Sequence, residues 1–148
     1  MSQNGRIGNN MDKFQFMDVL GEKMESLKNR LIENTNITGK GYKVISKALI
    51  NANECCVAYL SCIRNPQDES IDLIIDISFK KNTVFLDTDI YWSDGSFIED
   101  LGSIEIPFED SNNIKSSLED YFNYLVDNEL KKYSDFVIQQ KTNRTENS

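Results

Sequence analysis

The chain has 148 residues, of which 39% are hydrophobic and 27% are charged, as expected for one globular domain with its own core. Sixteen Lys and Arg residues against 24 Asp and Glu residues give a net charge of −8. This balance disfavours a general nucleic-acid binder and favours a basic partner surface. The chain has no histidine, which excludes a Ser-His-Asp triad, a Cys-His pair and a histidine metal site.

The sequence predicts a cytoplasmic protein. No apolar run reaches the ~20 residues of a membrane-spanning helix, and residues 1–10 lack the apolar core of a signal peptide. We expect a single domain over residues 1–148, with flexible ends at 1–10 and 141–148. In the cytoplasm the cysteines are expected to be reduced, buried and free of metal: Cys55, Cys56 and Cys62.

A first helix is predicted near the N-terminus, because apolar residues recur there at steps of three and four. It ends before the segment 34–41, which is rich in asparagine and glycine. The apolar stripe consists of Phe14, Met17, Leu20, Met24, Leu27 and Leu31.

The period of the pattern changes after this helix. Residues 42–52 place apolar side chains on one helical face and favour a second, shorter helix. Residues 54–63 are rich in strand formers and predict a strand, which a turn at 65–68 ends. The helical face within 42–52 consists of Ile45, Ala48, Leu49 and Ala52.

The centre of the chain predicts a β-hairpin. Residues 70–80 and 83–92 both alternate with a period of two, as half-buried strands do. A two-residue loop at Lys81-Asn82 places the apolar sides of both strands on the same face, so both strands support this register. The predicted pairs are Phe79 with Val84, Ile77 with Leu86, Ile75 with Thr88, Leu73 with Ile90 and Ile71 with Trp92.

A second tight turn is predicted at Asp94-Gly95. It leads into a strand over 97–106, in which Gly102 marks a bulge and which Pro107 ends. We expect the indole of Trp92 to be buried. The predicted pairs are Trp92 with Phe97, Tyr91 with Ile98 and Asp89 with Asp100.

The last predicted element is a helix over about 112–139. Acidic residues at 109–112 suit its positively polarised N-terminus. The predicted fold is therefore α+β, with N-terminal helices, an antiparallel β-meander of three to four strands and a long C-terminal helix. The helices pack on one face of the sheet.

The other face of this sheet is predicted to be acidic. Asp76 stands opposite Asp87, and like charges placed directly opposite destabilise a sheet by a few tenths of a kcal/mol or more. Folding alone does not favour such pairs, although an open antiparallel sheet also shows a polar, merely solvated face as a rule. Ile74 and Ile98 are predicted to lie on the same face. The residues that we predict to bind a partner are Asp72, Asp76, Phe85, Asp87, Asp89, Tyr91 and Asp100.

We expect neither enzymatic activity nor a cofactor. Paired catalytic carboxylates are held in a cleft, whereas a sheet face is flat. The segment Gly39-Lys40-Gly41 is too short for a phosphate-binding loop and is typical of a joint between elements.

Two stretches carry a family resemblance: GKGYKVISKALINANECCVAYLSC at 39–62 and DIYWSDGSFIEDLG at 89–102. Together with the small acidic α+β frame, they resemble immunity proteins of bacterial contact-dependent growth inhibition and related polymorphic toxin systems. The resemblance implies a cytoplasmic antidote that binds a toxin domain, often a nuclease, and blocks its active site or substrate surface. These proteins share no common motif, so no site residue follows from it.

Two alternatives remain open. A type III secretion chaperone is also small, acidic and cytoplasmic, but it usually has a helix inserted in the middle of its sheet, and its grooves are apolar. A nucleic-acid-mimicking inhibitor would use the same acidic face, although −8 over 148 residues is modest for mimicry.

Overall fold

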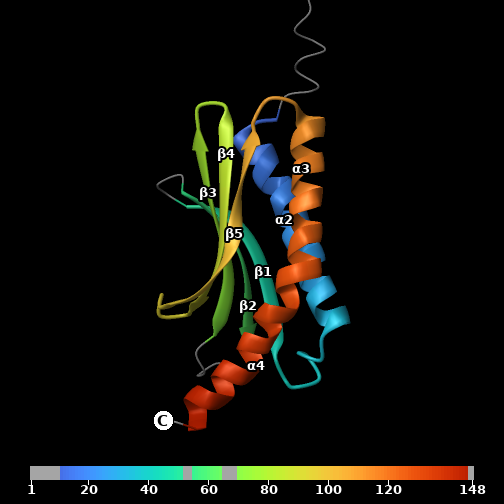
Figure 1. The fold of residues 1–148 in the computed structure, drawn as a ribbon. Coiled ribbons are helices and arrows are strands. Elements are labelled where there is room, and N and C mark those ends of the chain that lie inside the picture. The colour runs from blue at the N-terminus through green and yellow to red at the C-terminus, as the bar shows by residue number, and fades with distance from the viewer. Residues whose placement is uncertain (1–10, 52–54, 65–69, 147–148) are drawn as a thin grey trace, which may run out of the picture.

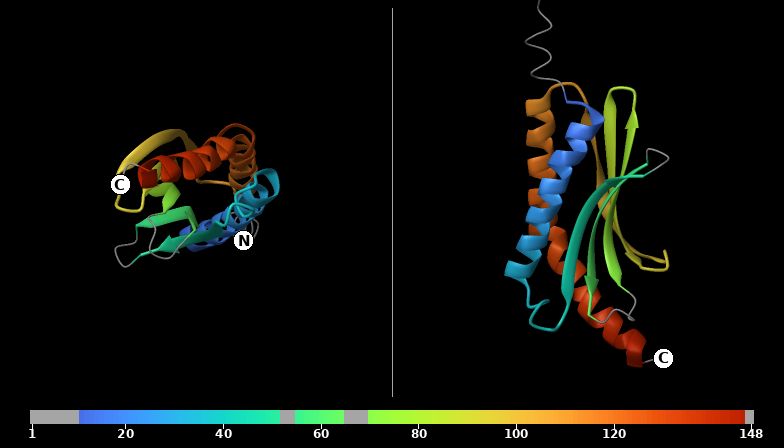
Figure 2. Two further views of the ribbon diagram at one scale, coloured as in Figure 1. Left: turned by 90° about the horizontal axis from the view of Figure 1, so that it is seen from below. Right: turned by 180° about the vertical axis from the view of Figure 1, so that it is seen from behind.

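Helices cover one side of a five-stranded antiparallel sheet (Figure 1, Figure 2). The computed structural model describes residues 11–51, 55–64 and 70–146, and no helix within these ranges lies on the other side of the sheet. None of the described helices is long and apolar enough to cross a bilayer. The elements are α2 (Lys13–Asn34), β1 (Lys43–Ile50), β2 (Cys56–Ile63), β3 (Ile71–Lys80), β4 (Thr83–Trp92), β5 (Phe97–Pro107), α3 (Ser111–Tyr124), a π-helical turn η1 (Leu125–Glu129) and α4 (Leu130–Glu146).

The α+β class and the long C-terminal helix are confirmed, but the number of strands is not. The sheet has five strands in the order β1-β2-β3-β4-β5, so each strand pairs with its neighbours in sequence. The segment predicted as a second helix forms β1, which pairs with β2 along its whole length. The predicted segment 1–10 and the turn at 65–68 lie outside the described residues.

The predicted β3–β4 register is confirmed at every pair, from Phe79–Val84 to Ile71–Trp92. The β4–β5 hairpin differs by one residue near its turn, because Tyr91 and not Trp92 stands opposite Phe97. Ile98 falls at the resulting register shift and packs against the core, so it does not join the acidic face. Trp92 is only half-buried, not buried as expected.

The register between β4 and β5 shifts again at Gly102. This glycine has φ +106°, and its neighbour Leu101 is the extra residue of the bulge. The shift at Ile98, nearer the turn, had already restored the predicted pairing of Asp89 with Asp100. The predicted bulge is therefore present and sets which residues of β5 face outward.

α2 begins with a capping box. The Asp12 side chain accepts a hydrogen bond from the backbone N–H of Gln15, and the Gln15 side chain accepts one from that of Asp12. The helix turns its apolar stripe to the sheet, except that Phe14 is 64% exposed and does not belong to the stripe. Phe16 is fully buried in its place.

The C-terminal helix continues to Glu146 and does not end near residue 139. The Asp110 side chain accepts a hydrogen bond from the backbone N–H of Asn113 and caps its start. The π-helical turn η1 joins α3 to α4, which crosses the lower end of the sheet in the view of Figure 1.

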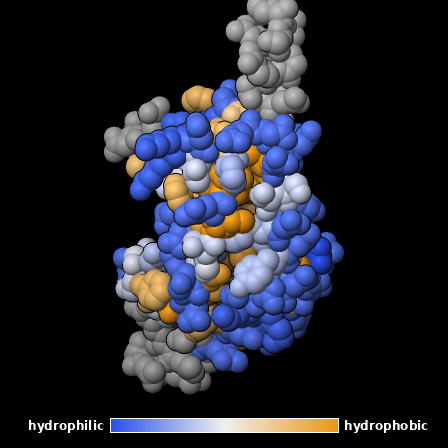
Figure 3. Space-filling model, turned by 45° about the horizontal axis from the view of Figure 1, so that its top comes forward, coloured by the Kyte–Doolittle hydropathy of each residue, from blue (hydrophilic) through white to orange (hydrophobic). Residues whose placement is uncertain are grey.

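The core lies between the helices and the sheet. Apolar residues form a band down the middle of the view in Figure 3, where the sheet and the helices meet. Buried tyrosines tie the two layers together: the Tyr133 hydroxyl on α4 donates to the carbonyl oxygen of Ile71 at 2.6 Å, and the Tyr121 hydroxyl on α3 is hydrogen-bonded to that of Thr88. These contacts fix which sheet face is covered.

Candidate docking surface on the outer sheet face

All seven residues predicted to bind a partner lie on the outer face, by which we mean the side of the sheet away from the helices. Asp76 stands directly opposite Asp87, and Asp89 stands opposite Asp100, as the sequence predicted. The residues come from β3 (Asp72 and Asp76), β4 (Phe85, Asp87, Asp89 and Tyr91) and β5 (Asp100).

Three carboxylates form the centre of the acidic part of this face. One oxygen each of Asp87, Asp89 and Asp100 lies within 4.8 Å of the other two. Asp89 is only 6% exposed, and the Tyr91 hydroxyl donates to its Oδ2 at 3.4 Å. No ion pair joins these three acids to a lysine or arginine of the described chain. The cluster therefore keeps its mutual repulsion.

This crowding changes the proton affinity of the cluster. Burial raises the pKa of Asp89 to about 6, and the charge of Asp87 together with a hydrogen bond and the charge of Asp100 adds to the effect. Burial and the charge of Asp87 also raise the pKa of Asp76. A nearby cation would favour the charged forms and lower both pKa values.

The β1–β2 part of the outer face is apolar, which the sequence did not predict. The Ser46 hydroxyl donates to Glu25 of α2 at 2.7 Å, and Gly21 of α2 packs against Ala48, so the alternate residues of β1 point outward. The outward apolar residues of this part belong to no core cluster: Ile45, Leu49, Val57, Tyr59 and Ile63, adjoined by Ile74 of β3.

The outer face is also divided by charge. Lys43 and Lys47 point outward from β1, both are exposed, and neither forms an ion pair with another described residue. The face thus runs from a basic edge at β1, across apolar residues of β2 and Ile74 of β3, to the acids of β3, β4 and β5.

A hollow adjoins the acidic part where β2 begins. It has a volume of about 610 Å³, which lies within the usual range of ligand pockets. Exposed Asp76 and Asp87 line it together with Phe85, Lys13 and Cys55. Cys55 is exposed, which corrects the expectation that all three cysteines are buried.

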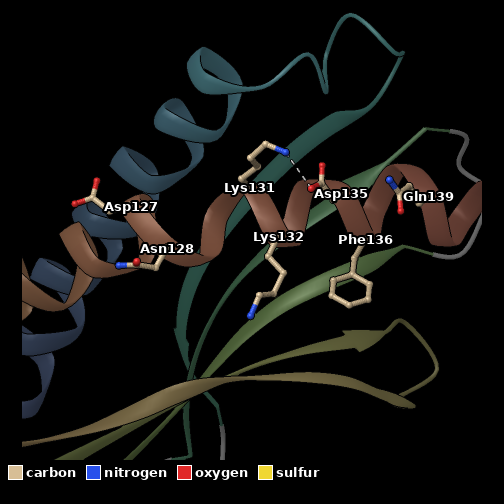
Figure 4. Close-up of a pocket in the computed structure, with 7 residues that line it drawn as sticks. All are labelled: Asp127, Asn128, Lys131, Lys132, Asp135, Phe136 and Gln139. Carbon is tan, nitrogen blue, oxygen red and sulfur yellow. Dashed lines mark hydrogen bonds and ion pairs between the residues drawn. The ribbon is translucent and has the colours of Figure 1, made fainter.

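A second hollow runs along η1 and α4 (Figure 4). It has a volume of 400 Å³, and residues of η1 and α4 alone line it. Lys132 and Phe136 point from α4 toward the strands, where Lys132 pairs with Glu99 of β5 at 3.6 Å, while Lys131 pairs with Asp135 on the helix. No set of nucleophile, base and oxyanion donors converges among these residues.

The three carboxylates offer oxygen atoms of the kind that Ca²⁺ and Mg²⁺ prefer. Such ions take six or more oxygens, whereas an open sheet face supplies three side chains here. The amine of a lysine or the guanidinium of an arginine from a partner fits the same oxygens through charge-assisted hydrogen bonds. The cluster is therefore suited to a cationic side chain.

Comparison of the chain with protein-family models, curated proteins and solved structures found no match. The functional argument consequently depends on the geometry of the outer face.

Proposed function

We propose that the outer face of β3–β5 binds a basic surface of a protein partner. The observation that carries this proposal is the cluster of Asp87, Asp89 and Asp100, which is held within 4.8 Å with no lysine or arginine of the described ranges paired to it. Its cost in repulsion falls when a lysine or arginine binds, so the face gains more from a cationic partner than separate acids would.

We further propose that the partner is a toxin domain and that the protein acts as a cytoplasmic immunity protein. The resemblance to immunity proteins of contact-dependent growth inhibition supports this role, as does the net charge of −8. Nuclease toxins are basic where they meet nucleic acid. An acidic inhibitor associates with them quickly and covers that surface without needing a catalytic group.

A second candidate function draws support from the apolar part of the outer face. A secretion chaperone holds an extended effector segment on apolar surface, and Ile45, Leu49 and Tyr59 offer such surface beside the acids. Such chaperones usually have a helix inserted in the middle of their sheet, however, and no described helix interrupts the sheet here. Binding to a folded toxin domain therefore stays the primary proposal.

The test begins with the tagged protein, used to capture its partner from the source cells. Association rates are then compared for the wild type and Asp87→Lys, because Asp87 is exposed and stands opposite Asp76. Glu33→Lys on α2 is the matched control, since it makes the same change in net charge on the helical layer. We expect Asp87→Lys alone to slow association by roughly tenfold at low salt.

Equal rates for Asp87→Lys and Glu33→Lys would refute the acidic docking surface. The immunity role has its own readout: the wild type should inhibit the activity of the captured domain and protect cells that express it. A captured partner that is an unfolded segment, and not a toxin, would favour the chaperone function.

A further inference from the structure

The larger of the two hollows described above lies at a step in the sheet. β2 begins at Cys56, which pairs with Ile77, whereas β3 continues to Lys80. Among the described residues, β3 beyond Ile77 therefore pairs with β4 alone, and the β3–β4 hairpin projects past the start of β2 (Figure 1). The hollow of 610 Å³ occupies this step. This part of the outer face is thus concave, unlike the flat sheet beside it.

Two carboxylates and an aromatic ring line the hollow. Asp76 and Asp87 are both exposed and stand directly opposite one another on β3 and β4. The β-carbons of such a pair lie ~4.5–5.5 Å apart, so both carboxylates can reach one ligand. Phe85 precedes Asp87 by two residues on β4 and therefore points to the same face. Its ring is half-buried and does not belong to the core.

The described lining of the hollow carries a net negative charge. Lys13 of α2 is its one cation, against two acids, and the Lys13 ammonium lies 5.9 Å from the centre of the Phe79 ring. Neither Asp76 nor Asp87 forms an ion pair with a described lysine or arginine. Burial and the charge of Asp87 raise the pKa of Asp76, as expected where two carboxylates share a site without a cation between them.

Lys80 already approaches the Phe85 ring. Its Nζ lies 5.8 Å from the ring centre, near the ~6 Å limit of a cation–π contact. Lys80 is exposed and forms no ion pair with a described acid. The ring therefore faces a cation that the two carboxylates do not hold. A cation that contacts the ring and the carboxylates together would bind more firmly than this lysine.

We infer that this hollow binds the guanidinium group of an arginine side chain, which stacks on the Phe85 ring and donates hydrogen bonds to Asp76 and Asp87. The inference rests on the proposed function for the source of the arginine, which is the basic partner. The binding itself rests on the hollow alone.

The lining selects a guanidinium over other cations. A guanidinium is planar, so it stacks on an aromatic face while its fixed fork of N–H donors reaches two carboxylates. The ammonium of a lysine is a compact, strongly hydrated charge that gains less from the ring. Ca²⁺ and Mg²⁺ need oxygen atoms on all sides, and Phe85 occupies one side of the hollow without offering any.

The hollow adjoins the cluster of Asp87, Asp89 and Asp100 and shares Asp87 with it. A partner that places an arginine in the hollow therefore brings a second cation close to that cluster as well. Arginines seated in pockets are typical of the few residues that dominate the affinity of an interface. We expect the arginine in the hollow to be such a residue of the partner.

The experiment is a titration of the ¹⁵N-labelled full chain, followed by two-dimensional NMR at pH 7.5, and it needs no partner. The probe is N-acetyl-arginine amide. The matched control probe is N-acetyl-citrulline amide at the same ionic strength, because citrulline has nearly the same shape and no charge. We expect the arginine probe to shift the amide signals of residues 76–78 and 85–87 with a dissociation constant of about 1–10 mM. The citrulline probe should leave them in place.

Two pairs of variants separate the ring from the charge. Phe85→Leu removes the ring, and Phe97→Leu is its control, because Phe97 is exposed on β5 and does not line the hollow. Asp76→Asn removes one charge, and Asp18→Asn on α2 makes the same change outside the hollow. Phe85→Leu and Asp76→Asn should each raise the dissociation constant about threefold or more, and the controls should not. The same spectra verify folding, and Asp76→Asn tests the hollow by itself if Phe85→Leu fails to fold.

Three results would overturn the inference: no saturable shift at residues 76–78 and 85–87, equal binding of the citrulline probe, or equal effects of Asp76→Asn and Asp18→Asn. Its failure is distinguishable from failure of the proposed function. If the arginine probe binds in the hollow but the captured partner has no basic surface, the hollow is upheld and the proposed function is refuted. If a basic partner binds the outer face although the probe does not bind, the reverse holds.

Discussion

Replacing Asp89 by asparagine should stabilise the protein at neutral pH. Asp89 is 6% exposed, and the neighbouring Asp87 and Asp100 help to raise its pKa from 3.8 to about 6. The amide of asparagine carries no charge, and it can donate a hydrogen bond to Asp100 as the protonated carboxyl does. The substitution thus removes a buried, repelled charge while it keeps the local contact.

The magnitude and the pH window follow from the pKa. A tenfold change in proton affinity is worth about 1.4 kcal/mol, so the rise corresponds to at most ~3 kcal/mol. Because two of the three carboxylates are exposed to solvent, we expect about 1–2 kcal/mol. The folded state binds the proton more tightly than the unfolded state, so the wild type loses stability as pH rises from about 4 to about 6. Above that window the full penalty is present.

The assay is urea unfolding between pH 4 and pH 8, followed by circular dichroism. It is run at two protein concentrations, so that a contribution from self-association is visible. The free energy of unfolding of Asp89→Asn should exceed that of the wild type at pH 7.5 and approach it near pH 4. The control is Asp18→Asn on α2, which makes the same substitution at an exposed position outside the cluster. If Asp89→Asn is no more stable than the wild type at pH 7.5, the carboxylates do not repel one another as the structure indicates.

Two further predictions concern the core and the thiols. Tyr133→Phe should lower the free energy of unfolding by about 1–3 kcal/mol, because it leaves the carbonyl oxygen of Ile71 without its 2.6 Å donor; an unchanged urea midpoint would contradict this. Thiol titration of the native protein at pH 8 should detect one fast-reacting group, Cys55, since Cys56 is buried and burial raises the pKa of Cys62 to about 12. Three equally fast thiols would show that β2 is not packed as described.

The sequence predicted the β3–β4 hairpin well because both strands carry a strict period of two. The inner face of each is apolar except for Thr88, and the outer face carries the acids, so a slip by one residue would bury them. Asp76, Asp87, Asp89 and Asp100 could therefore be placed on the outer face, and their cross-strand pairs could be predicted.

The same reasoning failed at β1 because this strand has apolar residues on both faces. Val44 and Ala48 point to α2, while Ile45 and Leu49 point outward, so no period of two is visible. The spacing of Ile45, Ala48 and Leu49 matched a helix instead. The apolar part of the outer face was missed for this reason. The run of β-branched and apolar residues in β1, next to the segment 54–63 that was predicted as a strand, could have indicated it.

The error near the β4–β5 turn has a different cause. Asp94-Gly95 predicts a two-residue loop. In the structure the backbone N–H of Trp92 donates to the carbonyl of Ser96 at 2.8 Å, so the loop contains the three residues 93–95. This single residue moves Phe97 to the outer face, where its ring packs edge-on against Tyr91. A tertiary preference for the aromatic pair cannot be read from the turn residues.

The neighbour-to-neighbour order of the sheet has a consequence for how the chain folds. Every strand pairs with one that is adjacent in sequence, so the sheet can form by closing short loops. The helical layer is different, because α2 meets α3 through Lys23 and Glu119, which are 96 residues apart. We therefore expect hairpins to form early and the two terminal helices to dock last. A chain emerging from the ribosome would hold α2 without its helical neighbours until residues 111–146 have been made.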